Sequence, residues 1–296
     1  MVDERKVAIL RITDVALDAA RELLRREGFV ELLPVIIAPV TDPLRHTIGR
    51  ATIRAYDQEW YLTTSMIFHK QAAIQVLDKI FCLSPNIRLE PATWGGTGRH
   101  LFEFVQLDLE VRDATRDGML ALGERLLVHI VERVRGACSR ELGTLGRELT
   151  ELRAPFDRIP YRDAKTRYGE GFEELLSRKA EDPIWIVDFP AEVREFYDRE
   201  DPSRPGVLLD MDLLYPEGYG EALSGGEREH EPGQIRDRIR RQGLDPAVYG
   251  SLLSVARPPS AGFGIGIERL VRFLGGLPHV REVRLFPRVP GEPAEM

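Results

Sequence analysis

The sequence has few cysteines, since Cys82 and Cys138 are the only two among its 296 residues. Their separation along the chain fits neither a disulfide framework nor the paired ligand spacing of a zinc site. Disulfides are rare in reducing compartments, so we expect a chain that does without them to be cytoplasmic.

Long hydrophobic runs are absent as well. No apolar stretch is long enough to span a bilayer, and the N-terminal MVDERKVAIL is charged and lacks the apolar core of a secretory signal. We therefore expect no membrane association. Lys and Arg number 41 against 48 Asp and Glu, which gives a formal net charge of −7. This acidic balance disfavours an extensive RNA-binding surface but leaves a local basic patch open.

The sequence shows no internal repeat, and its length allows one large domain or two small ones. With Thr13 as N-cap and Gly28 as a left-handed stop, residues 13–28 are predicted to form a helix. Further helices are expected at 64–80, 117–137, 228–243 and 266–275, and strands within 28–43 and at 81–90, 102–112, 184–189 and 207–215. Strands in hairpin-like order with helices outside them predict an α+β fold with an antiparallel sheet. The lack of strict βαβ alternation argues against a doubly wound nucleotide-binding fold.

The segment IRLEPATWGGTGRHLFEFVQLDLE, residues 87–110, gathers charged and aromatic side chains in a predicted hairpin. Arg88 and Glu90 are two residues apart on a strand and share a face, and Phe104 follows on the return strand. A guanidinium binds phosphate oxygens bidentately, a carboxylate accepts from an exocyclic amine, and a phenyl ring stacks on a base. The hairpin therefore suits a nucleoside triphosphate, and a surface hairpin laced with salt bridges is the alternative of equal weight.

Two glycine clusters match no common nucleotide motif. GGTG is not a Walker loop, because no Gly-Lys-Ser/Thr follows it, and GFGIGIER at 262–269 has neither the spacing nor the preceding strand of a dinucleotide fingerprint. We interpret the second cluster as a glycine-rich turn that permits close backbone approach. Arg269 stands at the start of the helix that follows, where an anion is favoured.

Three segments resemble motifs 1, 2 and 3 of the class II aminoacyl-tRNA synthetases in order and spacing: GFVELLPVIIAP, IRLE with RHLFEF, and GFGIGIERL with FPR. Four others resemble segments of the aspartyl/asparaginyl subgroup: SMIFHKQ, PFDRIPYRDA, DFPAEVREFY and GEALSGGEREH. The resemblance covers nearly the whole chain. It implies a class II synthetase-like antiparallel sheet flanked by helices, and an adenylate-forming site that uses ATP and Mg²⁺.

The resemblance also implies roles for single residues. Arg88 and Arg269 would be catalytic, with Arg88 on the α-phosphate and the reacting carboxylate. Glu90 would contact the adenine amine, and Phe104 and Arg269 would enclose the adenine. The full set of implied ATP-binding residues is Arg88, Glu90, Arg99, His100, Phe104, Glu221 and Arg269.

A metal site and an amino-acid site follow from the same resemblance. Asp212 and Glu221 would hold Mg²⁺ on the triphosphate, which requires hard oxygen ligands. Ser65, Lys70 and Arg228 would bind the amino acid, with the two cations gripping a carboxylate of L-aspartate. The alternatives are a solvated helix position for Lys70 and ordinary surface acids at 212 and 221.

Within the subgroup, LSPNIRLE and TGRHLFEFVQLD resemble the archaeal asparagine synthetases related to aspartyl- and asparaginyl-tRNA synthetases. We expect residues 1–296 to form a single catalytic domain without the OB-fold that reads the anticodon in the tRNA ligases. The leading expectation is an AMP-forming asparagine synthetase that joins L-aspartate, ATP and ammonia without tRNA. A minimal aspartyl- or asparaginyl-tRNA ligase and a non-catalytic regulatory paralogue are the alternatives.

Such a synthetase would activate the side-chain carboxylate of aspartate. Lys70 and Arg228 would then hold the α-carboxylate, and the β-carboxylate would turn toward Arg88. Candidates for binding the amino group are Glu110, Glu217 and Ser224. Motif 1 usually forms the class II dimer interface, so a two-fold homodimer is expected.

Overall fold

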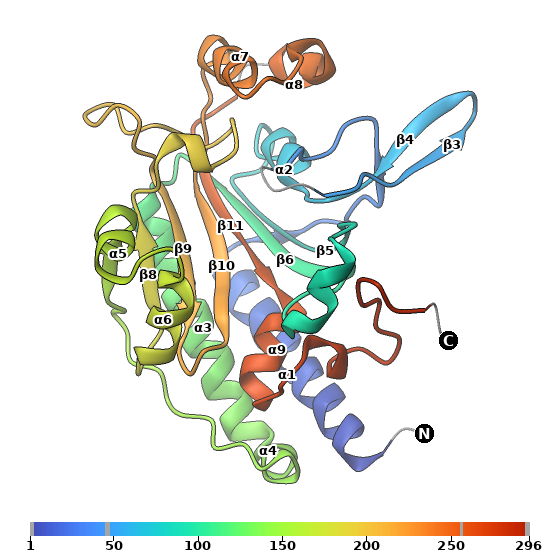
Figure 1. Ribbon diagram of the computed structural model, residues 1–296, viewed down its shortest axis with the longest axis vertical. Helices are drawn as coiled ribbons and strands as arrows, with labels where there is room; N and C mark the ends of the chain where they lie inside the picture. The colour runs from blue at the N-terminus through green and yellow to red at the C-terminus, as the bar shows by residue number, and fades with distance from the viewer. Residues whose placement is uncertain (1–2, 45–47, 255–256, 294–296) are drawn as a thin grey trace.

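The computed structural model describes residues 3–44, 48–254 and 257–293, which form a large sheet with helices packed on both faces (Figure 1). Eight strands lie in the order β1-β5-β6-β11-β10-β9-β8-β7. The edge pairs β1–β5 and β7–β8 are parallel, and all pairs between them are antiparallel. The predicted α+β fold, a largely antiparallel sheet flanked by helices, is confirmed.

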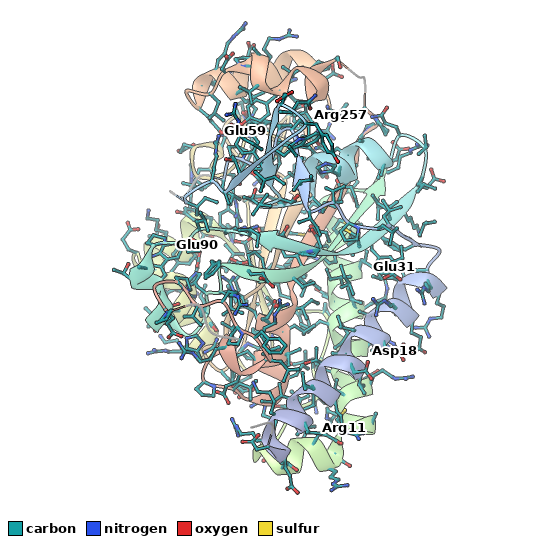
Figure 2. The ribbon with its side chains drawn as sticks, turned by 90° about the vertical axis from the view of Figure 1, so that its right-hand side faces the viewer. Arg11, Asp18, Glu31, Glu59, Glu90 and Arg257 are labelled. Atoms are coloured by element: carbon teal, nitrogen blue, oxygen red, sulfur yellow. The ribbon has the colours of Figure 1, made fainter. Side chains whose placement is uncertain are left out.

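The large sheet consists of β1 (Val30–Glu31), β5 (Lys79–Ile87), β6 (Glu103–Arg112), β7 (Arg158–Pro160), β8 (Ile184–Val187), β9 (Asp210–Tyr215), β10 (Gly220–Glu227) and β11 (Ser260–Gly266). A smaller sheet contains β2 (Ile37–Ala38), β3 (Thr52–Ala55) and β4 (Gln58–Leu62), and its β3–β4 hairpin projects at the upper right of Figure 1. Figure 2 shows Glu59 of this hairpin near the top of the molecule, far from Arg11 and Asp18 on the first helix.

The main hydrophobic core lies between one face of the central strands and the helices α1 (Glu4–Arg26), α3 (Arg116–Ala137) and α9 (Ile267–Gly275). Leu107 and Leu109 of β6 enter this core, as do Phe263 and Ile265 of β11. Each pair is two residues apart, so the positions between them face the other side of the sheet. The core therefore takes alternate residues of the central strands.

The opposite face of the central strands is polar. On β6 it carries Phe104, Gln106, Asp108 and Glu110, and on β11 it carries glycines. Around this face lie α2 (Ile67–Ala73), α7 (Pro232–Arg241) and α8 (Gly250–Leu253), while α5 (Tyr161–Tyr168) and α6 (Phe172–Lys179) pack against β8 and β9. The site described below is built on this face.

A β-bulge decides which β10 side chains face the site. Ser224 pairs with Asp212 of β9, and the extra residue Ala222 interrupts the ladder before Glu221. Because strand side chains alternate between faces, one inserted residue moves Glu221 to the face that carries Ser224 and Asp212. Without the bulge this carboxylate would point into the hydrophobic core.

The first helix begins earlier than predicted. Its N-cap is Asp3, whose carboxylate accepts a hydrogen bond from the backbone N–H of Lys6 at 2.7 Å. Thr13, the expected cap, lies inside the helix, and its hydroxyl donates to the carbonyl of Ile9. Gly28 is left-handed, with φ +87°, as predicted for the residue that ends this helix.

Other elements also differ from the sequence-based expectation. Residues 28–43 form only the short β1 and β2, because Pro34 and Pro39 have no N–H to donate to a ladder. The helix expected at 64–80 stops at Ala73, and the one expected at 228–243 spans Pro232–Arg241. The presumed glycine-rich turn at 262–266 is the central strand β11, and neither β10 nor the β3–β4 hairpin was predicted.

The segment that resembles motif 1 leaves Leu33 and Ile36 exposed. A homodimer through this segment stays a prediction, as does a single catalytic domain over residues 1–296. Among the described residues no helix is long and apolar enough to cross a membrane. Cys82 and Cys138 are buried free thiols.

The close approach of β10 and β11 makes Gly225 a test of the sheet. A Cβ added at Gly225 would lie 2.1 Å from the carbonyl oxygen of Gly262. That oxygen belongs to the backbone and cannot move without disturbing the ladder. Gly225→Ala is therefore expected to lower the free energy of unfolding by roughly 2–3 kcal/mol, measured by urea denaturation.

The matched control is Gly143→Ala in α4 (Ser139–Leu145), where an added Cβ meets nothing within 4 Å. This change should raise the free energy of unfolding by about 0.5–1 kcal/mol, because alanine restricts the unfolded chain. If both substitutions shifted stability in the same direction by similar amounts, the close packing at Gly225 would not be the cause.

Candidate functional site

The β5–β6 hairpin, the bulged end of β10 and the first turn of α9 enclose a cavity, here called the hairpin cavity. All seven residues expected to bind ATP line it: Arg88, Glu90, Arg99, His100, Phe104, Glu221 and Arg269. Glu90 lies on the side of the molecule away from Glu31 (Figure 2). The charged residues of the hairpin thus line a concave site rather than a flat, solvated face.

Arg88 is held on the wall of this cavity by three contacts. Its Nε donates to the carbonyl of Thr64 at 3.1 Å, and its Nη2 donates to Oε1 of Gln106 at 3.4 Å. Its Cζ lies 5.1 Å from the centroid of the Phe104 ring. The guanidinium is therefore oriented in advance for an oxyanion in the cavity.

Arg269, in the first turn of α9, contacts residues of β10 and of the loop between β5 and β6. Its Nη1 lies 3.1 Å from Oε1 of Glu221, and its Nε donates to the carbonyl of Arg99 at 3.2 Å. Burial opposes ionisation of Glu221, but the nearby guanidinium groups of Arg269 and Arg194 outweigh it and lower the pKa of this carboxyl. Glu221 is therefore an anion at neutral pH.

His100 is an uncharged member of the cavity. Its Nδ1 lies 2.6 Å from the hydroxyl of Thr97, and its ring centroid is 4.6 Å from that of Trp94. Burial, with the charges of Arg269 and Arg99, lowers the pKa of His100 to about 4. Any contact with phosphate would therefore rest on hydrogen bonding by a neutral imidazole.

A second cavity, here called the polar cavity, adjoins the first and shares Arg88, Gln106 and Glu221 with it. The three residues expected to bind the amino acid all line it: Ser65, Lys70 and Arg228. Other charged residues of its lining are Asp42, Asp108, Arg194, Glu195 and Asp198. The two cavities thus form one continuous polar site.

Lys70 is buried, not solvated, with 3% of its surface exposed. Its Nζ lies 2.8 Å from Asp108 and 3.7 Å from Glu110. Arg228 lies 3.2 Å from Glu110 and 3.0 Å from Asp198. Both cations line the polar cavity and are also paired with carboxylates of the protein itself, and their expected role in binding a substrate carboxylate stays a prediction.

The three candidates for binding an amino group lie in different places. Glu110 is fully buried and already bonded to Arg228. Glu217 pairs with Arg147 at the β9–β10 turn and lines neither cavity. Ser224 lines the polar cavity. The geometry therefore favours Ser224 among these three.

Asp212 and Glu221 fit a site for Mg²⁺. Asp212 is buried, which excludes an ordinary surface acid, and its Oδ1 lies 2.7 Å from Nη2 of Arg194 without hydrogen-bond geometry. Burial and the like charge of Glu221 raise the pKa of Asp212, an effect that a shared cation would relieve. Mg²⁺ in nucleotide enzymes is usually held by one or two carboxylates together with phosphates. Within the described ranges no group of three or more His, Cys, Asp or Glu side chains is arranged for a metal.

Sequence reasoning missed part of the polar face of β6. Gln106 and Asp108 stand between Phe104 and Glu110 at the same two-residue spacing, and both line the polar cavity. The signal was present, because these polar residues alternate with core residues such as Leu107. Asp42 and Asp198 left no such signal, since they reach the cavity from loops.

The pairing of Arg228 predicts a large effect of its removal. Arg228→Met would leave Asp198 buried without its ion-pair partner and Glu110 with only Lys70 at 3.7 Å, so the free energy of unfolding should fall by roughly 3–5 kcal/mol in a denaturant titration. Arg204→Met is the control, because Arg204 binds Asp188 and Asp201 at the exposed surface. It should cost less than about 1 kcal/mol. Equal losses would contradict the buried network.

Comparisons with known proteins identify the family. The model of the class II tRNA synthetases (D, K and N) matches residues 1–290. The asparagine–tRNA ligase of Symbiobacterium thermophilum is 34% identical in an alignment 310 residues long that covers 96% of this chain and 70% of that protein. The Pyrococcus abyssi asparagine–tRNA ligase is 33% identical in an alignment 302 residues long that covers 96% of this chain and 68% of that protein.

Solved structures of tRNA synthetases have the same fold as this chain. Asparaginyl-tRNA synthetase from Pyrococcus horikoshii, complexed with asparaginyl-adenylate, matches with a TM-score of 0.90 and 30% identity, covering 98% of this chain and 70% of that one. Aspartyl-tRNA synthetase from Entamoeba histolytica matches with a TM-score of 0.80 and 26% identity, covering 98% and 60%.

These relatives overturn the leading functional expectation. They are tRNA ligases, so the prediction of an ammonia-dependent asparagine synthetase and of no tRNA among the partners was wrong, and the tRNA-ligase alternative fits better. The short segments that suggested the synthetase branch lie in the β5–β6 hairpin, which is expected to bind ATP, and both activities use ATP. With motifs 2 and 3 meeting in the hairpin cavity and the family model matching residues 1–290, the chain belongs to the class II tRNA synthetases (D, K and N).

Proposed function

We propose that this chain activates asparagine with ATP to form asparaginyl-adenylate and transfers the asparaginyl group to tRNA. The observation that carries the proposal is the junction of the two cavities, where Arg88 and Glu221 line both. A triphosphate in the hairpin cavity and an amino acid in the polar cavity would meet at Arg88. Holding two reactants together in this way lowers the entropic part of the barrier.

The residues of the hairpin cavity suit ATP. Phe104 and Arg269 offer surfaces for the adenine ring, and Glu90 offers an acceptor for its amine. A carboxylate oxygen of the amino acid would attack the α-phosphorus, and the bond to the bridging oxygen of the leaving pyrophosphate would break. Arg88, fixed by Thr64 and by the Phe104 ring, would stabilise the charge that develops on the α-phosphate oxygens. Mg²⁺ on Asp212 and Glu221 would neutralise the triphosphate.

The charges of the polar cavity support asparagine over aspartate. Lys70 and Arg228 are already neutralised by protein carboxylates. Oδ2 of Asp108 is buried and has no hydrogen-bond partner. The NH₂ of a carboxamide can donate to such an oxygen, whereas a second carboxylate would be repelled. The asparagine–tRNA ligases among the relatives support the same choice.

Transfer to tRNA is supported by the relatives and by local cations. Arg99 lines the hairpin cavity and also a neighbouring cavity that Arg178 and Arg272 share. The same cavity is lined by Glu170, Glu173 and Glu174, and Arg178 pairs with Glu174. Arg99 and Arg272 are therefore the guanidinium groups that we expect to meet phosphates of an acceptor end. Contact with tRNA would therefore be concentrated beside the reacting atoms.

The test is ATP–pyrophosphate exchange followed by charging of unfractionated tRNA, each with asparagine or aspartate. We expect exchange with asparagine to exceed exchange with aspartate by at least about 100-fold in kcat/KM, because a site that hydrogen-bonds the amide rejects the carboxylate. Arg88→Lys keeps the charge but loses the guanidinium fork, and should lower the exchange rate by about 100-fold.

Three results would contradict the proposal. Exchange that prefers aspartate would mean that the polar cavity selects a dicarboxylate. Formation of asparagine from aspartate and ammonium without tRNA would show that the chain is an ammonia-dependent asparagine synthetase. Absence of exchange with every amino acid would point to a non-catalytic paralogue.

A further inference from the structure

Arg194 holds its guanidinium against two aspartates of β9. Its Nε lies 2.9 Å from Oδ2 of Asp210, and its Nη2 lies 2.7 Å from Oδ1 of Asp212. Its Cζ is 3.8 Å from the centroid of the Phe189 ring, and 17% of its side chain is exposed. A planar cation is thus enclosed between an aromatic ring and two carboxylates, one of which is an expected Mg²⁺ ligand.

The two contacts of Arg194 differ in kind. Asp210 is satisfied, because its Oδ2 accepts from Arg194 and its Oδ1 accepts from the backbone N–H of Phe189. Nη2 of Arg194 and Oδ1 of Asp212 are both buried and close, yet neither has a hydrogen-bond partner. Asp210 therefore anchors the guanidinium through a hydrogen bond, while Asp212 holds it as a close ion pair of poorer hydrogen-bond geometry. The second contact is the one that an incoming cation can replace.

The surrounding charges explain why a cation is needed here. Asp212 and Glu221 lie on one face of β9 and β10 and repel each other. Buried carboxylates without a counter-charge are forced toward protonation. Burial raises the pKa of Asp212 although the charge of Arg194 opposes it, and at Glu221 the charges of Arg269 and Arg194 outweigh burial and lower the pKa. Arg194 supplies the positive charge at the place where the family would bind its metal.

We propose that Arg194 is the counter-ion that occupies Asp212 until nucleotide binds, so that the site rejects a divalent cation offered alone and accepts it together with the triphosphate. The proposal rests on the proposed function only for the identity of the nucleotide. A cation alone must displace the guanidinium from Asp212, whereas a cation that arrives with phosphate oxygens brings additional ligands of its own. Arg194 remains anchored on Asp210 and is a positioning residue.

The experiment measures Mn²⁺ binding by electron paramagnetic resonance of the free ion, with and without α,β-methylene-ATP. Arg194→Met should bind Mn²⁺ without nucleotide at least about tenfold more tightly than the unsubstituted protein, since an adjacent cation changes a carboxylate's proton affinity by about tenfold or more. The factor by which the nucleotide analogue raises the Mn²⁺ affinity should be correspondingly smaller in this variant. Mn²⁺ and the analogue change each other's affinity by the same factor, so the binding of the analogue can be measured to check it.

Two further variants control the measurement. Arg199→Met removes the same charge from a nearby arginine that pairs with Glu227 and makes no contact with Asp212, and its Mn²⁺ affinity should stay within about twofold of the original. Arg194→Lys keeps the charge but has no fork to reach both aspartates, so its affinity should be intermediate. Circular dichroism checks that each variant is folded.

The proposal is overturned if Arg194→Met binds Mn²⁺ alone no better than the unsubstituted protein, or if Arg199→Met gains as much. If Arg194→Met does not fold, Arg194→Lys decides the matter, and an unchanged affinity overturns the proposal. Neither asparagine nor tRNA enters this assay. A failed charging experiment would therefore leave the Mn²⁺ result standing, and the two failures are distinguishable.

Discussion

The two-residue repeat of the central strands is the constraint on which both the core and the site depend. On β11, Phe263 and Ile265 fill the core, and Gly262, Gly264 and Gly266 alternate with them on the polar face. A Cβ at Gly262 would lie 2.2 Å from Oε2 of Glu110, so a side chain there would displace the charged residues of β6. A slip of one residue would bury the charges and expose the core. The bulge in β10 shifts the alternation of side chains by one residue and thereby places Glu221 on the polar face.

Charge compensation is the second organising feature. The polar cavity contains cations and carboxylates in close pairs, and buried ions of this kind persist only when each has a partner. Lys70 and Arg228 pair with protein acids, Arg269 pairs with Glu221, and Arg194 is hydrogen-bonded to Asp210 and lies in ion-pair distance of Asp212. What remains for a substrate is a site of balanced charge with fixed hydrogen-bonding groups. Such a site would select by hydrogen bonding more than by net charge, and on this ground we propose an amide rather than a carboxylate as its substrate.

The sequence alone predicted the α+β class and the residues of the hairpin cavity, because motif spacing and two-residue alternation are local signals. It failed where the answer depended on strand neighbours. The glycine run at 262–266 was taken for a turn, since nothing local shows that Gly264 packs against Asp108 in the middle of a sheet. The pairing of Lys70 with Asp108 was likewise invisible, because the two residues are 38 positions apart and meet only across α2 and β6. The choice between an asparagine synthetase and a tRNA ligase was wrong because both reactions use ATP, and the residues that suggested the choice lie in the hairpin expected to bind it.

The central claim is that the joined cavities assemble asparaginyl-adenylate. Native mass spectrometry of the protein after incubation with ATP, Mg²⁺ and asparagine, without tRNA, tests this most directly. The account predicts a bound species with the mass of asparaginyl-adenylate, which disappears when tRNA is added. A protein that retains only ATP and free amino acid, or that forms an adenylate only with aspartate, would contradict it.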